Sequence, residues 1–139
     1  MATQNTGYQR ATNLTVRRGN DARVYSLLDG FSIEVPIEPF IMQVKTDNTG
    51  TSNDNQFRIP TNASYTYDYT VERCDASGNV LQTLENQTGD VTLTWDVAGT
   101  YLVKIYPKAD GSGFPAIYFN YDYDRDKLLD VTQWGSSIW

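Results

Sequence analysis

Short segments in which apolar and polar residues alternate recur along most of this chain. In residues 31–38, apolar side chains occupy every second position, namely Phe31, Ile33, Val35 and Ile37. A period of two places alternate side chains on one face of a β-strand. We predict this strand and further strands at residues 40–46, 56–59, 65–74, 79–84, 91–95, 100–106 and 116–121.

Turn signals separate these segments at short intervals. Gly78, Gly89 and Gly99 each lie between two predicted strands, and glycine adopts positive φ without steric cost. Regularly spaced short strands joined by such turns are typical of a sandwich or a barrel. We therefore predict an all-β antiparallel β-sandwich. The residues expected to fill the space between its sheets are Val91, Leu93 and Trp95 together with Tyr101, Val103 and Ile105.

The length of 139 residues suits one domain, and we divide the chain into three parts. Residues 1–39 are predicted to be an N-terminal arm, acting as an anchor or a peripheral β element. Residues 40–121 are predicted to form the sandwich, and residues 122–139 a short closing segment. The only helix-like window is 122–133, where Leu128, Leu129 and Val131 suit one short turn.

Charge and hydropathy exclude two classes of partner. The net charge is −6, and residues 1–30 carry four arginines against two aspartates, so this part is +2 and the remainder −8. Such an acidic body repels phosphate backbones, and we expect no nucleic-acid binding. No window approaches the roughly 18 apolar residues of a spanning helix, and the first residues do not resemble an export signal. We therefore expect no membrane insertion and no export.

The chain has no histidine and a single cysteine. Serine–histidine and cysteine–histidine mechanisms are thereby excluded, as are histidine metal sites and an internal disulfide. We interpret Cys74 as a small packed side chain. Glu72, Asp75, Asp90 and Asp96 lie near turns, where solvated acids are more common than a glycosidase pair. We expect a protein without catalytic activity and without a cofactor.

The strongest metal candidate is a run of alternating carboxylates near the C-terminal end. Asp122, Asp124 and Asp126 provide oxygen ligands of the kind that Ca²⁺ prefers. Lys127 and Gln133, however, replace the glycine and the bidentate glutamate of an EF-hand loop. These aspartates are therefore weak calcium candidates, and we expect no metal.

Two groups of residues are candidates for partner contacts. Tyr65, Tyr67 and Tyr69 alternate and are predicted to share one strand face, which suits stacking on sugars or an interface. Packing against the second sheet is nevertheless the interpretation that we favour for these rings. In the basic arm, Arg17 and Arg18 are the other candidates.

Residues 47–55 form a polar stretch around Gly50. Its aspartate, asparagine, threonine and serine side chains readily bond to their own backbone. We expect an ordered, self-bonded loop, with contact to a partner as the alternative.

Several stretches resemble a known family. Residues 96–105 read DVAGTYLVKI, which resembles the Gly-Thr-Tyr-x-Val-x-Ile strand of immunoglobulin-like domains of the polycystic kidney disease type (PKD-like). Residues 45–56, 117–120 and 126–135 resemble the domain that precedes leucine-rich repeats in BspA-like bacterial surface proteins. Together the resemblance covers roughly residues 40–139, and it implies an Ig-like (PKD-like) sandwich that serves adhesion or display.

Related domains also occur in phage virions, and an initiator methionine without an export signal suits assembly in the cytoplasm. We therefore expect a non-enzymatic virion protein, a capsid decoration or tail-associated module, whose partners are other virion subunits and further copies of itself. One alternative is a fragment of an exported adhesin at the bacterial cell surface that binds a host protein or glycan. The other is a carbohydrate-binding module that uses the Tyr65, Tyr67 and Tyr69 face.

Overall fold

The structure of the protein is a computed structural model, which describes residues 24–27, 31–34, 36–121 and 123–139. Residues 24–27 and 31–34 are described by their backbone only. The elements in chain order are β1 (Val24–Leu27), β2 (Phe31–Glu34), β3 (Phe40–Lys45), β4 (Gln56–Ile59), β5 (Tyr69–Cys74), β6 (Val80–Gln87), β7 (Val91–Thr94), β8 (Thr100–Tyr106), the 3-10 helix η1 (Arg125–Lys127) and β9 (Leu128–Gln133).

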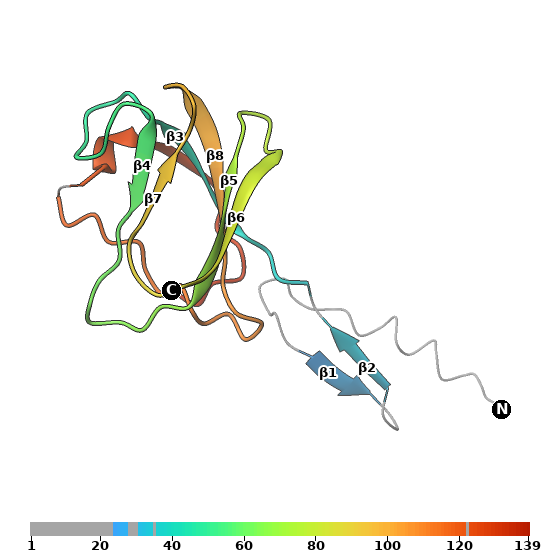
Figure 1. Ribbon diagram of the computed structural model, residues 1–139. Coiled ribbons are helices and arrows are strands. Elements are labelled where there is room, and N and C mark those ends of the chain that lie inside the picture. Colours follow the sequence, from blue (N-terminus) through green and yellow to red (C-terminus); the bar gives the residue numbers. More distant parts are fainter. Residues whose placement is uncertain (1–23, 28–30, 35, 122) are drawn as a thin grey trace.

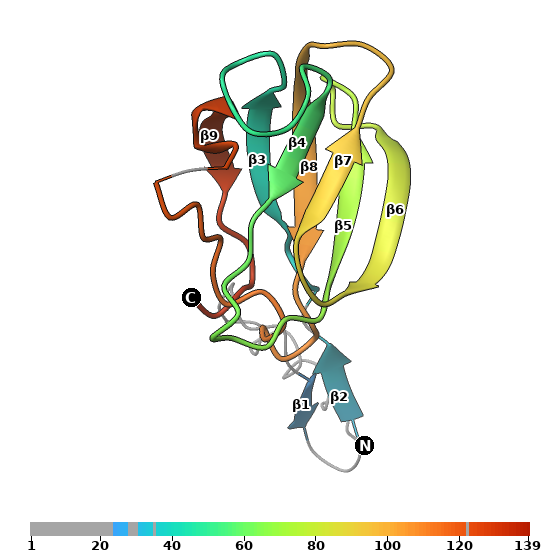
Figure 2. The same cartoon turned by 60° about the vertical axis from the view of Figure 1, so that its left-hand side comes forward.

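Two antiparallel sheets form the body of the molecule. The larger one has the strand order β6-β5-β8-β3-β9, and the smaller one pairs β4 with β7. Figures 1 and 2 show the β4–β7 pair lying across one face of the larger sheet. This arrangement confirms the predicted all-β antiparallel β-sandwich. Among the described residues, no helix has the length and apolar character needed to cross a membrane.

The core lies between the two sheets and follows the predicted alternation. Inward residues of β7 and β8 are buried, as expected for Leu93, Val103 and Ile105. The centre of the larger sheet is an unbroken β3–β8 register, in which Phe40 faces Ile105 and both are fully buried. The remaining buried apolar residues of the cluster are Met42, Val44, Phe57, Ile59, Tyr67, Tyr69, Val71, Val91, Trp95 and Phe114.

Trp95 joins the two sheets at one end of the core. Its indole ring stacks on Tyr101 with centroids 4.7 Å apart and an interplanar angle of 9°. The indole N–H donates to the carbonyl oxygen of Cys74 at 2.9 Å. A buried tryptophan needs such an acceptor for its one polar atom, and this bond links the chain after β7 to the end of β5.

Two segments adopt structures other than those predicted. Within the predicted helical window, residues 125–127 form the short helix η1, whereas residues 128–133 form β9, because pairing with β3 outweighs the local pattern. Residues 116–121 were predicted to be a strand, but they form no ladder. Ile117 and Phe119 nevertheless pack against the core, and the amide of Tyr118 donates to the carbonyl oxygen of Pro60 at 3.1 Å. The alternation in residues 116–121 therefore marked burial and not strand pairing.

The N-terminal part of the described chain is a small hairpin. Strands β1 and β2 pair antiparallel, with Val24 opposite Glu34 and Leu27 opposite Phe31. They form their own two-stranded sheet and pair with no other strand of the described residues. β2 ends at Glu34, two residues before Pro36, which cannot donate to a ladder.

The packing of β8 makes a direct prediction about stability. Ile105→Ala removes a fully buried side chain from the centre of the core, so we expect the free energy of unfolding to fall by about 2–5 kcal/mol. Leu129→Ala on β9, where the side chain is half exposed, should change it by about 0.5 kcal/mol or less. Urea unfolding of both variants measures the difference, and equal effects would contradict the core as described.

Candidate functional site

Two segments that are distant in sequence meet at one end of the sandwich. One is the polar loop of residues 46–55 between β3 and β4, and the other is residues 123–127 before β9. Asp124 and Lys127, both fully buried, lie at their contact. Buried charged groups are rare in proteins and need polar partners. The hydrogen-bond partners of Asp124 and Lys127 therefore show how this end of the sandwich is stabilised.

The carboxylate of Asp124 accepts hydrogen bonds from the loop and from β4. Its Oδ1 accepts from the backbone amides of Thr51 at 2.9 Å and Ser52 at 3.0 Å. Its Oδ2 accepts from the hydroxyl of Ser52 and the amide of Arg58, each at 2.5 Å. Burial alone would raise the pKa of Asp124, but these hydrogen bonds and the nearby charge of Lys127 hold the pKa below its usual value.

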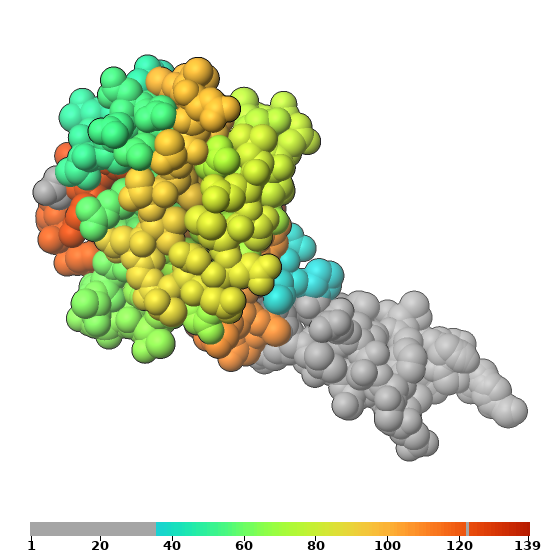
Figure 3. Space-filling view, viewed as in Figure 1, coloured from blue at the N-terminus to red at the C-terminus, as the bar shows by residue number. Residues whose placement is uncertain are grey.

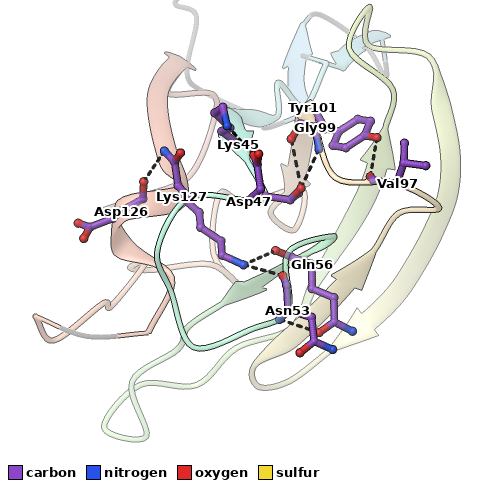
Figure 4. A network of polar contacts seen from close by, with 11 residues as sticks. Lys45, Asp47, Asn53, Gln56, Val97, Gly99, Tyr101, Asp126 and Lys127 are labelled. Atoms are coloured by element: carbon purple, nitrogen blue, oxygen red, sulfur yellow. Dashed lines mark hydrogen bonds and ion pairs between the residues drawn. The ribbon is translucent and has the colours of Figure 1, made fainter.

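The ammonium group of Lys127 does the reverse and donates to the loop. Its Nζ lies 3.1 Å, 2.7 Å and 3.0 Å from the carbonyl oxygens of Ser52, Asn53 and Gln56. Figure 4 shows the lysine side chain extending from η1 toward Asn53 and Gln56. A fourth contact, at 2.9 Å, is made to the hydroxyl of Ser52. The loop carbonyls thus surround a positive charge supplied by the chain itself.

Gly50 allows the two segments to approach this closely. A Cβ atom at this position would lie 2.5 Å from Oδ1 of Asp124 and 2.8 Å from Cε of Lys127. Any other residue would force the loop or these two buried side chains to shift. Asn48 adds a further contact, because its side-chain amide donates to the carbonyl oxygen of Asp126 at 3.0 Å. We call the contacts of Asp124 and Lys127 with this loop the loop latch.

A pocket of about 210 Å³ opens beside the loop latch. Tyr121 on its rim is 86 % exposed, and the ring of Tyr123 lies under the guanidinium group of Arg58, 4.7 Å from its centre. Arg125 and Asp126 form an exposed ion pair, with Nε 3.1 Å from Oδ1. The lining consists of Thr49, Gly50, Thr51, Tyr121, Tyr123, Arg125 and Asp126.

The backbone of this rim is strained. Asn120, Tyr121 and Tyr123 have φ angles of 49°, 65° and 59°, in the left-handed region that tyrosine seldom adopts. Each such residue costs on the order of 1–3 kcal/mol, and the surrounding structure must hold it in place. Strain of this kind gathers at ligand-binding sites and active sites, which makes this pocket the candidate functional site.

The calcium candidates do not converge in the structure. Asp124 is buried and its oxygens accept backbone amides, whereas Asp126 is exposed and pairs with Arg125. Asp122 lies outside the described residues. Among the residues that the structure describes, no group of three or more acids or cysteines is suitably placed to hold a metal ion.

The three alternating tyrosines do not share an exposed face. β5 begins only at Tyr69, and Tyr67 and Tyr69 are buried. Their hydroxyls donate hydrogen bonds to backbone carbonyl oxygens. Tyr67 donates to Ala116 at 2.8 Å, and Tyr69 donates to Gly89 at 2.7 Å. Burial raises the pKa of both phenols. Tyr65 is 54 % exposed and is the one member of this set that remains a candidate for partner contact.

Other predicted residues are placed as follows. Asp75 and Asp90 accept hydrogen bonds from the backbone amides of neighbouring turns. Cys74 is buried, and burial raises the pKa of its thiol. Arg17 and Arg18 lie outside the described residues.

Sequence reasoning missed the roles of Ser52, Tyr121, Tyr123 and Lys127. The sequence marks Lys127 only as a departure from a calcium loop, and it places Tyr121 in a predicted strand and Tyr123 in a predicted helical window. One signal was present, namely a lysine within an acidic run together with a glycine in a serine- and threonine-rich loop. Nothing in the local pattern, however, links positions about 75 residues apart.

Comparison of the chain with protein-family models, curated proteins and solved structures finds no match. The resemblance to PKD-like domains therefore remains a prediction about family. The structure establishes the coarser statement, an all-β antiparallel fold. The interpretation of the site rests on its geometry.

The loop latch predicts an unequal response of two lysines to substitution. Lys127→Met leaves the carbonyl oxygens of Ser52, Asn53 and Gln56 without their buried donor, so we expect a loss of about 1–3 kcal/mol in the free energy of unfolding. Lys45→Met removes only an exposed ion pair with Asp47 and should leave the free energy of unfolding nearly unchanged. Chemical denaturation compares the two variants, and a stable Lys127→Met protein would contradict the loop latch.

The pKa of Asp124 predicts a dependence of stability on pH. Because the folded-state pKa is lowered, the carboxylate stabilises the fold above the unfolded value of about 3.9. This contribution is lost as the pH falls through the folded-state pKa. Asp124→Asn should therefore be less stable than the parent protein at pH 7, and the gap should narrow below about pH 4. Urea midpoints across this range provide the test, and a gap that stays constant with pH would argue against it.

Proposed function

We propose that this protein is a non-enzymatic structural component of a phage virion, which attaches to other virion subunits through protein–protein contacts and displays its sandwich. The observation that carries this proposal is an exposed pair of tryptophans near the C-terminal end. Trp134 and Trp139 are 60 % and 49 % exposed, and their rings meet edge to face 5.5 Å apart. Aromatic side chains are enriched at protein interfaces, where they bury much area at little cost in entropy.

The tryptophan pair lies against the start of the sandwich. Both rings pack on Phe40, with centroids 5.5 Å and 4.9 Å away. Ser136 donates from its amide to the carbonyl oxygen of Glu38 and accepts from the amide of Glu38, both at 2.9 Å. The tryptophan pair therefore borders residues 38–40, at the start of the sandwich.

The small Gly135 turn fixes the orientation of these rings. Gly135 has a φ of 71°, and a Cβ there would lie 2.5 Å from backbone atoms of Glu38 and Pro39. The turn thus brings the chain flat against residues 38–39. A rigid aromatic pair binds with little loss of conformational freedom, which supports a permanent contact with another subunit.

Self-association of the protein has a separate support. β6 is an edge strand of the larger sheet, eight residues long, and most of its side chains are exposed. It forms one flank of the molecule in Figure 3. The strand includes the exposed apolar residues Val80 and Leu81 and contains no lysine or proline of the kind that blocks edge pairing. Pairing of such an edge with a second strand is a common mode of assembly.

The polar groups support a role without catalysis. Among the residues whose side chains are described, the buried charged groups are Asp124 and Lys127, and both make hydrogen bonds with the backbone of the β3–β4 loop. Burial raises the pKa of the Cys74 thiol and disfavours its reactive thiolate. The chain has no histidine to act as a general base near neutral pH.

Location and a matched pair of variants test this proposal. Quantitative mass spectrometry of purified phage particles from the host that carries the gene should find the protein at a fixed copy number. Trp134→Ser should abolish incorporation, whereas Tyr118→Ser, which removes another exposed ring elsewhere, should not. Both variants should melt cooperatively. Protein found on the cell surface and absent from particles would overturn the proposal in favour of an adhesin.

A further inference from the structure

We propose that the pocket beside the loop latch binds a carbohydrate through Tyr121, Tyr123 and the Arg125–Asp126 pair. This inference is independent of the virion proposal, because it concerns a different end of the sandwich and a different class of ligand. It rests on the shape of the pocket, the placement of two aromatic rings and the balance of charge at the rim.

The pocket suits a small ligand. Its volume of about 210 Å³ is below the range of about 300–1,000 Å³ that is typical of drug-sized ligands. One end of a glycan or a single sugar unit fits such a space better than a peptide strand or a helix. Residues 49–51 line part of the pocket, and the loop latch holds that loop through the Thr51 amide.

The ring of Tyr121 is held outward against a conformational cost. Tyr121 is 86 % exposed, although its backbone lies in the left-handed region. Solvent exposure of a tyrosine is ordinary, but exposure combined with a strained backbone at the rim of a pocket suggests a functional constraint. Tyrosine presents both an apolar ring face, on which the C–H face of a sugar stacks, and a hydroxyl that bonds to a sugar hydroxyl.

The charges at the rim favour a neutral, polyhydroxylated ligand. Arg125 and Asp126 neutralise one another through the 3.1 Å contact between Nε and Oδ1, and both side chains are about half exposed. The guanidinium group donates hydrogen bonds and the carboxylate accepts them. Sugar hydroxyls do both, so neighbouring hydroxyls complement this pair. A phosphate would meet the carboxylate, and an ammonium group would meet the guanidinium.

This assignment moves the sugar contact away from the face suggested by the sequence. Tyr67 and Tyr69 are buried and their hydroxyls are engaged with backbone carbonyls. Tyr65 therefore serves as a matched control, since it is an exposed tyrosine that does not line the pocket.

Titration of the ¹⁵N-labelled full-length chain tests the proposal. The probes are glucose, galactose and N-acetylglucosamine, the β-linked disaccharides of each, and inorganic phosphate. We expect saturable amide shifts at residues 49–51, 123, 125 and 126 with at least one sugar at millimolar concentration. Tyr121→Ala should weaken this binding by about tenfold or more, and Asp126→Asn should also weaken it. Tyr65→Ala should bind like the parent chain.

Three results would overturn the proposal. They are the absence of saturable shifts with every sugar, binding of phosphate alone, and sugar binding that survives Tyr121→Ala but is lost in Tyr65→Ala. Thermal melting of each variant establishes that it is folded. Tyr121 is so exposed that its removal should leave the melting temperature unchanged, which separates a loss of binding from a loss of structure.

Discussion

A buried carboxylate and a buried ammonium group hold the loop between β3 and β4 in one shape, and the candidate site depends on them. Removing two charges from water is costly, and the cost is offset only where hydrogen bonds satisfy both groups. Asp124 and Lys127 meet this condition with four short contacts each. Apolar packing between the sheets stabilises the sandwich, but it does not dictate the path of a polar loop. The directional hydrogen bonds of Asp124 and Lys127 dictate that path.

The two ends of the sandwich carry different surfaces. In Figures 1 and 2 the β3–β4 loop and η1 lie at one end, and the C-terminal residues lie toward the other. The first end has a small polar pocket with a strained aromatic rim, whereas the second has the Trp134–Trp139 pair beside the start of β3. This polarity suits a module that is attached at one end and presents the other.

The sequence predicted those parts of the fold that depend on burial within a strand. Alternation in residues 40–46 and 100–106 corresponds to β3 and β8, because a face that packs on a second sheet leaves a period of two. The alternating pattern did not predict the secondary structure where a neighbouring segment of the chain decides it. Ile117 and Phe119 alternate without a strand beside them, and residues 128–133 form a strand only because β3 offers an edge. The sequence did not predict the candidate site for the same reason, since Lys127 acquires its role from carbonyl groups far away in the sequence.

Amide hydrogen exchange tests the central claim most directly, that Asp124 fixes the loop from within. The amides of Thr51, Ser52 and Arg58 all donate to this one carboxylate. The account predicts that they exchange as slowly as the amides of the β3–β8 ladder, although two of them lie in a surface loop. The amide of the exposed Ser77, which donates to Asp75, should exchange fast. Exchange of Thr51 and Ser52 at the rate of Ser77 would contradict the account.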